Sequence, residues 1–224
     1  MLKARKRITK RQIKEDKFVT YYFKTVDFIK QHSSKVMIGS VAVFAIIILI
    51  LLVTQSKRTA ELNASEQLAK ANSEITRGEL QQAIDILLNM SDNYSGTNSA
   101  SKGVYLLAYT YFQKGGYENA ITYFRKYLDD YADDPILASA AYSGMGACFE
   151  QQGNFLEAAQ TYEKGAKSFA DQYNAPQQLM DAGRCYTLEN RIANARNCYE
   201  MIVEKYPDSS FKNDAELFLA KIKG

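Results

Sequence analysis

The sequence has 224 residues, and its 28 lysine and arginine residues against 25 aspartate and glutamate residues give a formal net charge of +3. It contains one histidine and three cysteines, none of them in a C-x-x-C pair, so neither a zinc site nor a disulfide framework is indicated. A single histidine also removes several common catalytic arrangements, and we expect no enzyme.

The near-neutral total is the sum of two ends of opposite charge. Residues 1–35 carry eleven basic and three acidic side chains, whereas residues 57–224 carry 17 basic and 22 acidic ones. Between them, residues 36–54 form 19 consecutive positions without a charge. This asymmetry predicts that the two ends lie in different environments.

Residues 36–54 are predicted to form a single transmembrane helix. At about 1.5 Å per residue they extend over about 28 Å, close to the ~30 Å hydrocarbon thickness of a bilayer. A cleaved signal peptide is the alternative, but 35 residues precede the segment and no small-residue cleavage site follows it. The excess of lysine and arginine before the segment predicts a cytoplasmic N-terminus and a C-terminal domain at the periplasmic face of a bacterial inner membrane.

The first 35 residues are predicted to form a basic cytoplasmic tail with an amphipathic helix. Basic residues crowd positions 3–14, and Phe18, Tyr22, Val26 and Ile29 follow at helical spacing. Three alternatives stay open: the tail only fixes the topology, binds membrane lipid at the inner leaflet, or contacts another membrane protein. Nucleic-acid binding is not expected, because no nucleic-acid-binding fold accompanies the charge.

A fourfold internal repeat follows the apolar segment. Each copy has a large apolar residue, an alanine three positions later and a second large apolar residue four positions after that. The copies are Leu80-x-x-Ala83-x3-Leu87, Tyr117-x-x-Ala120-x3-Phe124, Phe155-x-x-Ala158-x3-Tyr162 and Ile192-x-x-Ala195-x3-Tyr199. Two positions before each copy stands a residue that suits a left-handed helix end: Gly78, Gly115, Gly153 and Asn190. The pattern predicts four units of two helices each.

A matching first helix precedes the last three copies and carries a small residue at its centre, namely Ala108, Gly146 and Gly183. Small residues in both helices of a pair allow close approach while larger ones interlock around them. Proline occurs only between pairs, where a helix ends or begins, at Pro135, Pro176 and Pro207. No glycine or proline lies between Gly39 and Gly78, so the membrane helix is expected to run unbroken into the first repeat helix.

This pattern resembles the tetratricopeptide repeat (TPR) family over residues 60–224, although the tryptophan of that family's first helix is absent. The expected fold class is all-α, with one N-terminal transmembrane helix, a TPR-like α-solenoid of about four helix pairs and a C-terminal capping helix. The expected domains are 1–35, 36–54 and 55–224, with repeats at 60–97, 98–135, 136–172 and 173–207. The capping helix is expected at 208–223, with Leu217, Phe218 and Ile222 on its apolar face.

A narrower resemblance is to the YfgM-like TPR proteins, which also combine one N-terminal anchor with about four repeats. The stretches that carry this resemblance are residues 94–100, 116–121, 153–159, 175–179 and 204–210. It implies an ancillary partner of the SecYEG translocon and of periplasmic chaperones. The sequence Tyr-Pro-Asp-Ser at 206–209 also recurs in BamD-like and YbgF-like proteins. Those are lipid-anchored or released to the periplasm, and the retained anchor argues against them.

The sequence offers no catalytic residues, metal site or cofactor site. Asp129, Asp130, Asp133 and Asp134 lack the order of a calcium loop and are interpreted as a solvated turn between repeats. Cys148, Cys185 and Cys198 are expected to be small buried core residues, and a disulfide between the last two stays open.

The candidate site is the surface of the repeats. First helices of stacked pairs line a concave groove, and residues between their packing positions point into it. These residues are Lys102, Tyr105, Tyr109 and Phe112, then Ser143, Ala147 and Glu150, then Met180, Arg184 and Leu188. Aromatic, methionine and arginine side chains suit a peptide or a partner helix. The alternative is that Tyr105, Tyr109 and Phe112 only pack against the neighbouring repeat.

Together these features predict a membrane-anchored scaffold for protein partners. The expected partners are translocon subunits, periplasmic chaperones or client chains. The alternative is a structural accessory subunit of a larger respiratory, photosynthetic or envelope complex, bound through the anchor and the tail.

Overall fold

The computed structural model describes residues 17–223, and the chain divides into two compact units, Met1–Ser56 and Lys57–Gly224. Over the described residues it contains ten helices and no strand, which confirms the all-α fold class. The basic run at positions 3–14 lies outside the described residues.

The first unit holds helix α1 (Lys17–Gln31) and the amino-terminal part of helix α2 (Ser33–Arg77). Helix α2 is unbroken over 45 residues, as the lack of glycine and proline between Gly39 and Gly78 predicts. Its apolar side chains are exposed over residues 37–53. Among the described residues it is the one helix that is long and apolar enough to cross a membrane.

The amphipathic pattern of α1 places aromatic side chains on the surface. Tyr22 and Phe28 are exposed, and the Phe28 ring stacks on His32 with 4.7 Å between ring centroids. Val26 is half-buried and Ile29 is exposed. Phe18, the first member of the predicted stripe, has a side chain outside the described ones.

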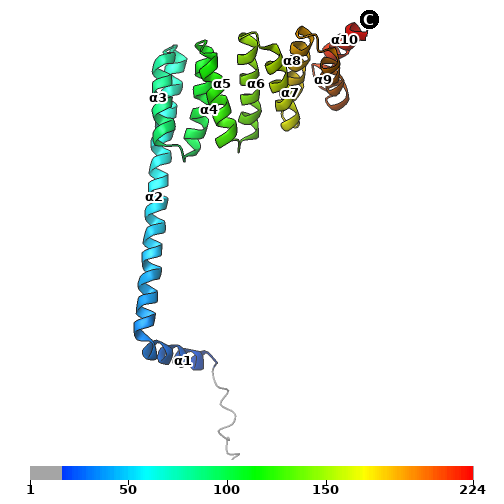
Figure 1. Ribbon diagram of the computed structural model, residues 1–224. Helices are drawn as coiled ribbons and strands as arrows, with labels where there is room; N and C mark the ends of the chain where they lie inside the picture. The colour runs from blue at the N-terminus through cyan, green and yellow to red at the C-terminus, as the bar shows by residue number, and fades with distance from the viewer. Residues whose placement is uncertain (1–16, 224) are drawn as a thin grey trace, which may run out of the picture. The chain divides into compact units, whose positions relative to one another are not determined.

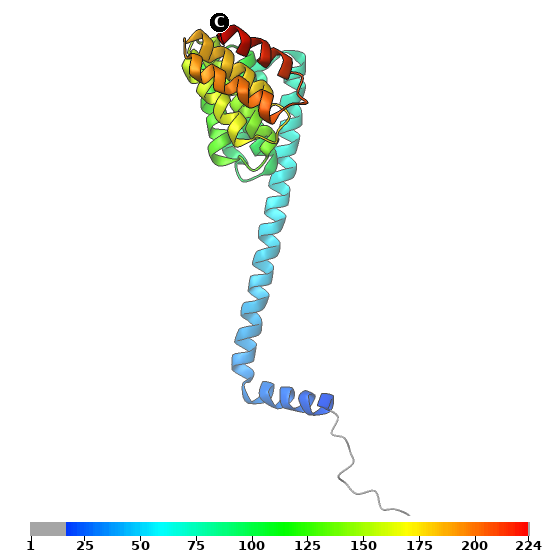
Figure 2. The same ribbon diagram turned by 90° about the vertical axis from the view of Figure 1, so that its right-hand side faces the viewer.

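The second unit stacks helix pairs in chain order (Figures 1 and 2). The carboxyl-terminal part of α2 shares a hydrophobic cluster with α3 (Leu80–Asn93). The later helices are α4 (Asn98–Gln113), α5 (Tyr117–Asp130), α6 (Pro135–Gln151), α7 (Phe155–Ser168), α8 (Ala175–Leu188), α9 (Ile192–Lys205) and α10 (Lys212–Lys223). The first residues of α3, α5, α7 and α9 are also the first residues of the four repeated motifs. The repeat pattern therefore predicted the start of every second helix.

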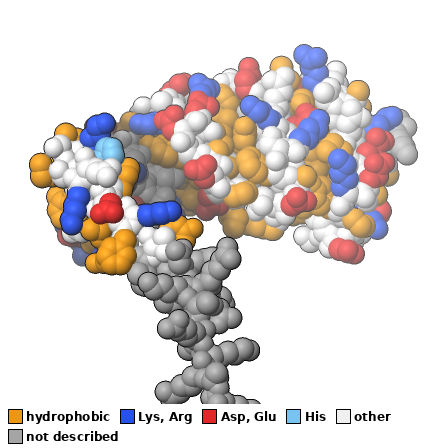
Figure 3. Space-filling model, turned by 90° about the horizontal axis from the view of Figure 1, so that it is seen from below, with side chains coloured by type: hydrophobic (Ala, Val, Ile, Leu, Met, Phe, Trp, Pro, Cys, Tyr) orange, Lys and Arg blue, Asp and Glu red, His pale blue; other side chains and the backbone are white. Residues whose placement is uncertain are grey.

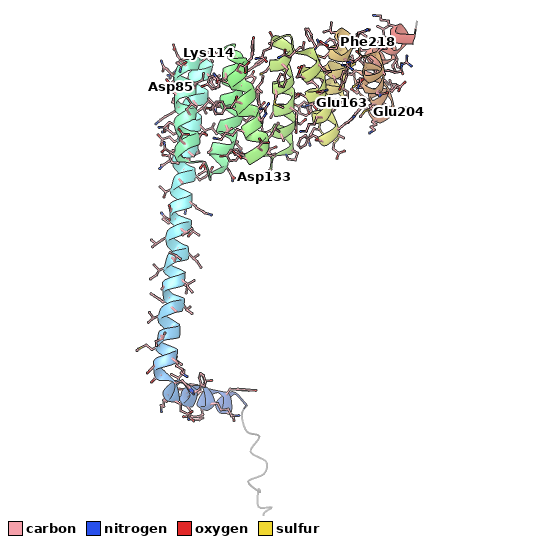
Figure 4. All side chains as sticks on the ribbon, in the orientation of Figure 1. Asp85, Lys114, Asp133, Glu163, Glu204 and Phe218 are labelled. Atoms are coloured by element: carbon pink, nitrogen blue, oxygen red, sulfur yellow. The ribbon has the colours of Figure 1, made fainter. Side chains whose placement is uncertain are left out.

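Turns within pairs and connections between pairs lie at opposite ends of the helices. Figure 4 shows Lys114, which follows α4, at one end and Asp133, between α5 and α6, at the other. The turns within pairs have left-handed backbone conformations, with φ of 81° at Gly78, 81° at Gly115, 77° at Gly153 and 54° at Asn190. At the other end the Asp134 carboxylate accepts hydrogen bonds from the backbone N–H of Ile136 at 2.9 Å and of Leu137 at 3.2 Å. One of the predicted turn aspartates is therefore the N-cap of α6.

Small residues lie where the helices of a pair meet. The four repeated alanines and Ala108 are fully buried. A Cβ atom at Gly146 would lie 2.6 Å from the ring of Tyr162, and one at Gly183 would lie 2.5 Å from the ring of Tyr199. Carbon atoms pack best at about 3.5–4.0 Å. Only glycine fits at these two positions, which explains the predicted run of small residues.

Hydrogen bonds to loops and helix ends join successive repeats. The Glu61 carboxylate of α2 accepts bonds from the backbone N–H of Asn98 at 2.8 Å and from Ser99 Oγ at 2.7 Å. It thus places negative charge at the amino terminus of α4, where the helix dipole favours it. The Tyr131 hydroxyl donates to the carbonyl of Ser95 at 3.1 Å, and Tyr206 makes the equivalent bond to Ala170 at 2.9 Å.

Helix α10 covers the end of the last pair. Its apolar stripe consists of buried Ala215 and half-buried Phe218, Leu219 and Ile222, and the Phe218 ring stacks on Tyr199 with 5.2 Å between ring centroids. Leu217 was expected on this apolar face, but it is 53% exposed. Successive residues point about 100° apart around a helix, so the neighbour of Phe218 turns away from the core.

Replacing Gly115 by alanine tests the turn conformation. We expect Gly115→Ala to lower the free energy of unfolding by about 1–2 kcal/mol, because an L-residue strains in the left-handed region. The matched control is Gly96→Ala, since Gly96 also has open space around its Cβ position but no left-handed backbone. That change should stay within about 0.5 kcal/mol or stabilise slightly. Urea unfolding of the full chain in detergent measures both, and equal losses would contradict the assignment.

Candidate functional site

A hollow of about 350 Å³ crosses the first helices of three successive pairs, α4, α6 and α8. We call this hollow the groove. On the face of the repeat unit shown in Figure 3, hydrophobic side chains gather between charged ones. The residues that line the groove are Tyr105, Tyr109, Phe112, Phe124, Ala140, Ser143, Gly144, Ala147, Tyr162, Tyr173, Asn174, Gln177 and Asp181. Five of them, namely Tyr105, Tyr109, Phe112, Ser143 and Ala147, are among the predicted groove residues.

Small side chains of α6 form the middle of the groove. Ala140, Ser143, Gly144 and Ala147 repeat at helical spacing and so share one face of the helix. A Cβ atom at Gly144 would overlap the ring of Phe124 beneath it. The middle of the groove is therefore lined by small side chains of α6 and by the Phe124 ring.

Aromatic residues of α4 form one wall. The Tyr105 ring makes edge-on contacts with Phe124 and Tyr127, each at 5.8 Å between centroids. Phe112 packs at 5.8 Å against Tyr117 of α5. Both residues thus line the groove and pack within their own pair. Tyr109 differs, because it is 41% exposed and belongs to none of the hydrophobic clusters.

The opposite wall comes from the start of α8 and the segment before it, whose residues were not among the predicted ones. Tyr173 is 81% exposed and precedes the helix, and Gln177 and Asp181 follow one and two turns later. The groove uses the second half of α4, the middle of α6 and the first half of α8, so it crosses the helices obliquely. Stacked helix pairs rotate relative to one another, and this rotation moves the lining residues along each helix.

A buried polar cluster holds the Tyr173 side of the groove against α6. The Ser139 hydroxyl donates to Asn174 Oδ1 at 2.8 Å. The Gln178 side-chain amide donates to the Ser139 carbonyl and to Ser143 Oγ, both at 2.8 Å. Because Gln178 is almost completely buried, these bonds fix the start of α8 in place.

The other predicted groove residues lie outside the hollow. Glu150 and Arg184 form an ion pair of 2.7 Å between α6 and α8. Met180 packs against the hydrophobic cluster of the last repeat, while Leu188 is 57% exposed. Lys102 lines a separate hollow of about 410 Å³ near Tyr131 and Asp133, in the connections between pairs. Their contribution to partner binding stays a prediction.

The two carboxylates near the groove, Glu150 and Asp181, differ in how closely Arg184 approaches them. A hydrogen bond from Arg184 holds the pKa of Glu150 below its usual value. Burial raises the pKa of Asp181 above its usual value, and Arg184, whose nearest nitrogen is 3.4 Å away, offsets this only in part. Burial also raises the pKa of Tyr105. Asp181 is therefore the less well compensated of the two carboxylates.

The cysteines have no part in the groove. Cys148, Cys185 and Cys198 are buried free thiols, so the structure contains no bond between the last two. Burial raises the pKa of each thiol to about 12. Within the described residues there is no group of three or more histidine, cysteine, aspartate or glutamate side chains that could hold a metal ion.

The fold and the groove define a TPR-like repeat scaffold. Residues 60–224 match the family model described as YfiO, outer membrane lipoprotein, and the chain belongs to this family.

Similar proteins include the chaperone protein SicA of Salmonella typhimurium, which is 28% identical over 123 residues, or 54% of this chain and 69% of SicA. A TPR protein from Parabacteroides merdae has a TM-score of 0.57 at 14% identity over 72% of this chain, which spans 60% of that structure's length. A putative kinesin light chain of Podosopora anserina has a TM-score of 0.54 at 15% identity, with 71% of this chain and 85% of that one covered. The two structures support the fold alone, and the YfgM-like resemblance stays a prediction.

Removing the Arg184 guanidinium tests whether its pair with Glu150 is structural. We expect Arg184→Met to lower the free energy of unfolding by about 1 kcal/mol. The reason is that the Glu150 carboxylate, whose side chain is only 22% exposed, loses its ion-pair partner. At pH values above the unfolded-state glutamate pKa of about 4.3, the variant should show the full decrease in the free energy of unfolding. It should disappear as the pH falls through the depressed pKa of Glu150, where the carboxylate is protonated in both states.

A double-mutant cycle with Glu150→Gln supplies the control. Urea unfolding at pH 7 should give a coupling energy of about 0.5–1 kcal/mol between the two substitutions. Additive losses would contradict a direct interaction.

Proposed function

We propose that this chain is a membrane-anchored scaffold that binds a segment of a partner protein in the groove. The N-terminus lies in the cytoplasm and the repeat domain, residues 55–224, at the periplasmic face of a bacterial inner membrane. The groove is the observation that carries this proposal, because it combines exposed aromatic side chains with a centre of small residues. Such surfaces accommodate peptide segments through aromatic anchors.

The apolar part of α2 supports the membrane placement. Its side chains are exposed over residues 37–53, and burying them in hydrocarbon removes a large apolar surface from water. The eleven basic residues before position 36 support the orientation. The aromatic face of α1, with Tyr22 and Phe28, suits the interface between headgroups and acyl chains, where the helix would bind membrane lipid.

The relatives support a role for the repeats in handling other proteins. SicA, which is 28% identical over 123 residues, is named as a chaperone. We extend this description to a role in protein translocation or chaperone recruitment, with translocon subunits, periplasmic chaperones or client chains as partners. This role corresponds to the YfgM-like resemblance.

A second function is favoured by the exposed aromatic residues of α1. If this face contacts another membrane protein instead of lipid, the chain is a structural accessory subunit of a larger membrane complex. In that case the anchor and tail, and not the groove, hold the partner.

Protease digestion tests the topology. Protease added to spheroplasts should remove residues 55–224, because the repeat domain faces outward, and inverted membrane vesicles should protect them. An epitope tag at the N-terminus is the control and should show the opposite pattern. Digestion of the repeat domain only in inverted vesicles would refute the orientation.

Affinity purification in mild detergent tests where the partner binds. Tyr109→Ala should reduce recovery of translocon or chaperone components by about tenfold, because it removes the exposed anchor of the groove wall. The matched control is Leu217→Ala on α10, an exposed apolar residue outside the groove, which should leave recovery unchanged. If deleting residues 1–54 abolishes recovery while Tyr109→Ala does not, the accessory-subunit function is the correct one.

A further inference from the structure

The charge inside the groove has one sign. Of the described residues that line it, only Asp181 has an acidic or basic side chain, apart from the tyrosine hydroxyls. Lys102 lies in the other hollow and Arg184 lies outside the groove, paired to Glu150. A ligand in the groove therefore meets a carboxylate and no lysine or arginine among these lining residues.

The Asp181 carboxylate is only partly neutralised by the protein. Its side chain is 29% exposed, and its contact with Arg184 is 3.4 Å long, whereas Arg184 approaches Glu150 to 2.7 Å. The guanidinium thus makes its strong bond with Glu150. A half-buried carboxylate that shares its arginine with a second, closer carboxylate gains from a ligand that supplies another cation, because charge-assisted hydrogen bonds strengthen as water is excluded.

Two exposed tyrosines of the groove favour the same kind of ligand. Tyr109 on the α4 side and Tyr173 on the α8 side are the most exposed aromatic residues of the groove, at 41% and 81%. Aromatic ring faces attract lysine and arginine head groups and also pack against their aliphatic stems. The small residues of α6 between the two walls leave room for such a stem.

We propose that the groove recognises a basic side chain of its partner. A lysine or arginine from the bound protein segment enters between Tyr109 and Tyr173, lays its stem over Gly144 and Ala147, and ends at the Asp181 carboxylate. This specificity rests on the proposed function of the groove. The volume of about 350 Å³ is at the small end of ligand pockets, which suits one or two anchor side chains. An acidic segment or a C-terminal carboxylate is disfavoured, because Asp181 would repel it.

The test uses the full chain in nanodiscs, panned against phage that display random 12-residue peptides. Selected peptides should share a lysine or arginine flanked by apolar or small residues. For a selected peptide made synthetically, replacing that residue by norleucine should weaken binding at least tenfold. Asp181→Asn should have the same effect, because it removes the charge at nearly constant shape, whereas Asp181→Glu should retain most of the binding.

Two control variants separate this inference from the proposed function. Asp133→Asn removes a carboxylate outside the groove and should leave binding unchanged. If Tyr109→Ala abolishes binding but Asp181→Asn does not, the groove binds peptides and the inference of a basic anchor is wrong. If neither substitution changes binding, or if no peptide is selected, the groove is not a peptide site and both proposals fail. Thermal unfolding of each variant verifies that the fold is intact.

Discussion

The repeat unit depends on how closely the two helices of each pair approach. This approach requires small side chains at the crossing points, and the structure places fully buried alanines there in every second helix. At Gly146 and Gly183 even a methyl group would collide with a tyrosine ring of the facing helix. The tyrosines fill the space that the glycines leave, so these two pairs, α6 with α7 and α8 with α9, are each held by a large residue set against a small one. The stacking of pairs follows from this, because only correctly formed pairs present matching surfaces.

The same constraint produces the groove. Helix α6 carries small residues on two faces: Gly146 faces α7 within its pair, whereas Gly144 admits the Phe124 ring of the preceding pair. Together with Ala140 and Ala147, Gly144 gives this face of α6 small side chains only, whereas the two walls of the groove carry Tyr109 and Tyr173. Small side chains between two aromatic walls leave a hollow. The small residues of α6 therefore account both for the close packing inside the solenoid and for the hollow on its surface.

The repeat pattern was sufficient to predict the helices and their turns. The left-handed residues Gly78, Gly115, Gly153 and Asn190 follow from their spacing and residue type together, because glycine and asparagine adopt this backbone conformation more readily than other residues. The groove residues predicted on α4 and α6 include five that line the hollow, whereas those chosen on α8 by repeat register, Met180, Arg184 and Leu188, lie outside it. Register assumes that equivalent positions line the groove in every repeat, and the rotation between pairs breaks that equivalence. Tyr173 lies in a connection outside the repeated motif, so no periodicity marks it.

Some groove residues also hold the repeats together and others do not, and this difference limits which of them can set the specificity of the groove. Tyr105, Phe112 and Phe124 belong to a hydrophobic cluster, so substitutions there change stability together with binding. Gly144 cannot enlarge without displacing the Phe124 ring. Tyr109, Tyr173 and Asp181 are different, since none of them belongs to the clusters that hold the repeats together. Substitutions at these three side chains therefore leave the packed clusters intact, and the proposed selection of a partner would act through them. That the three are two tyrosines and a carboxylate is a reason to look for a cation in the partner.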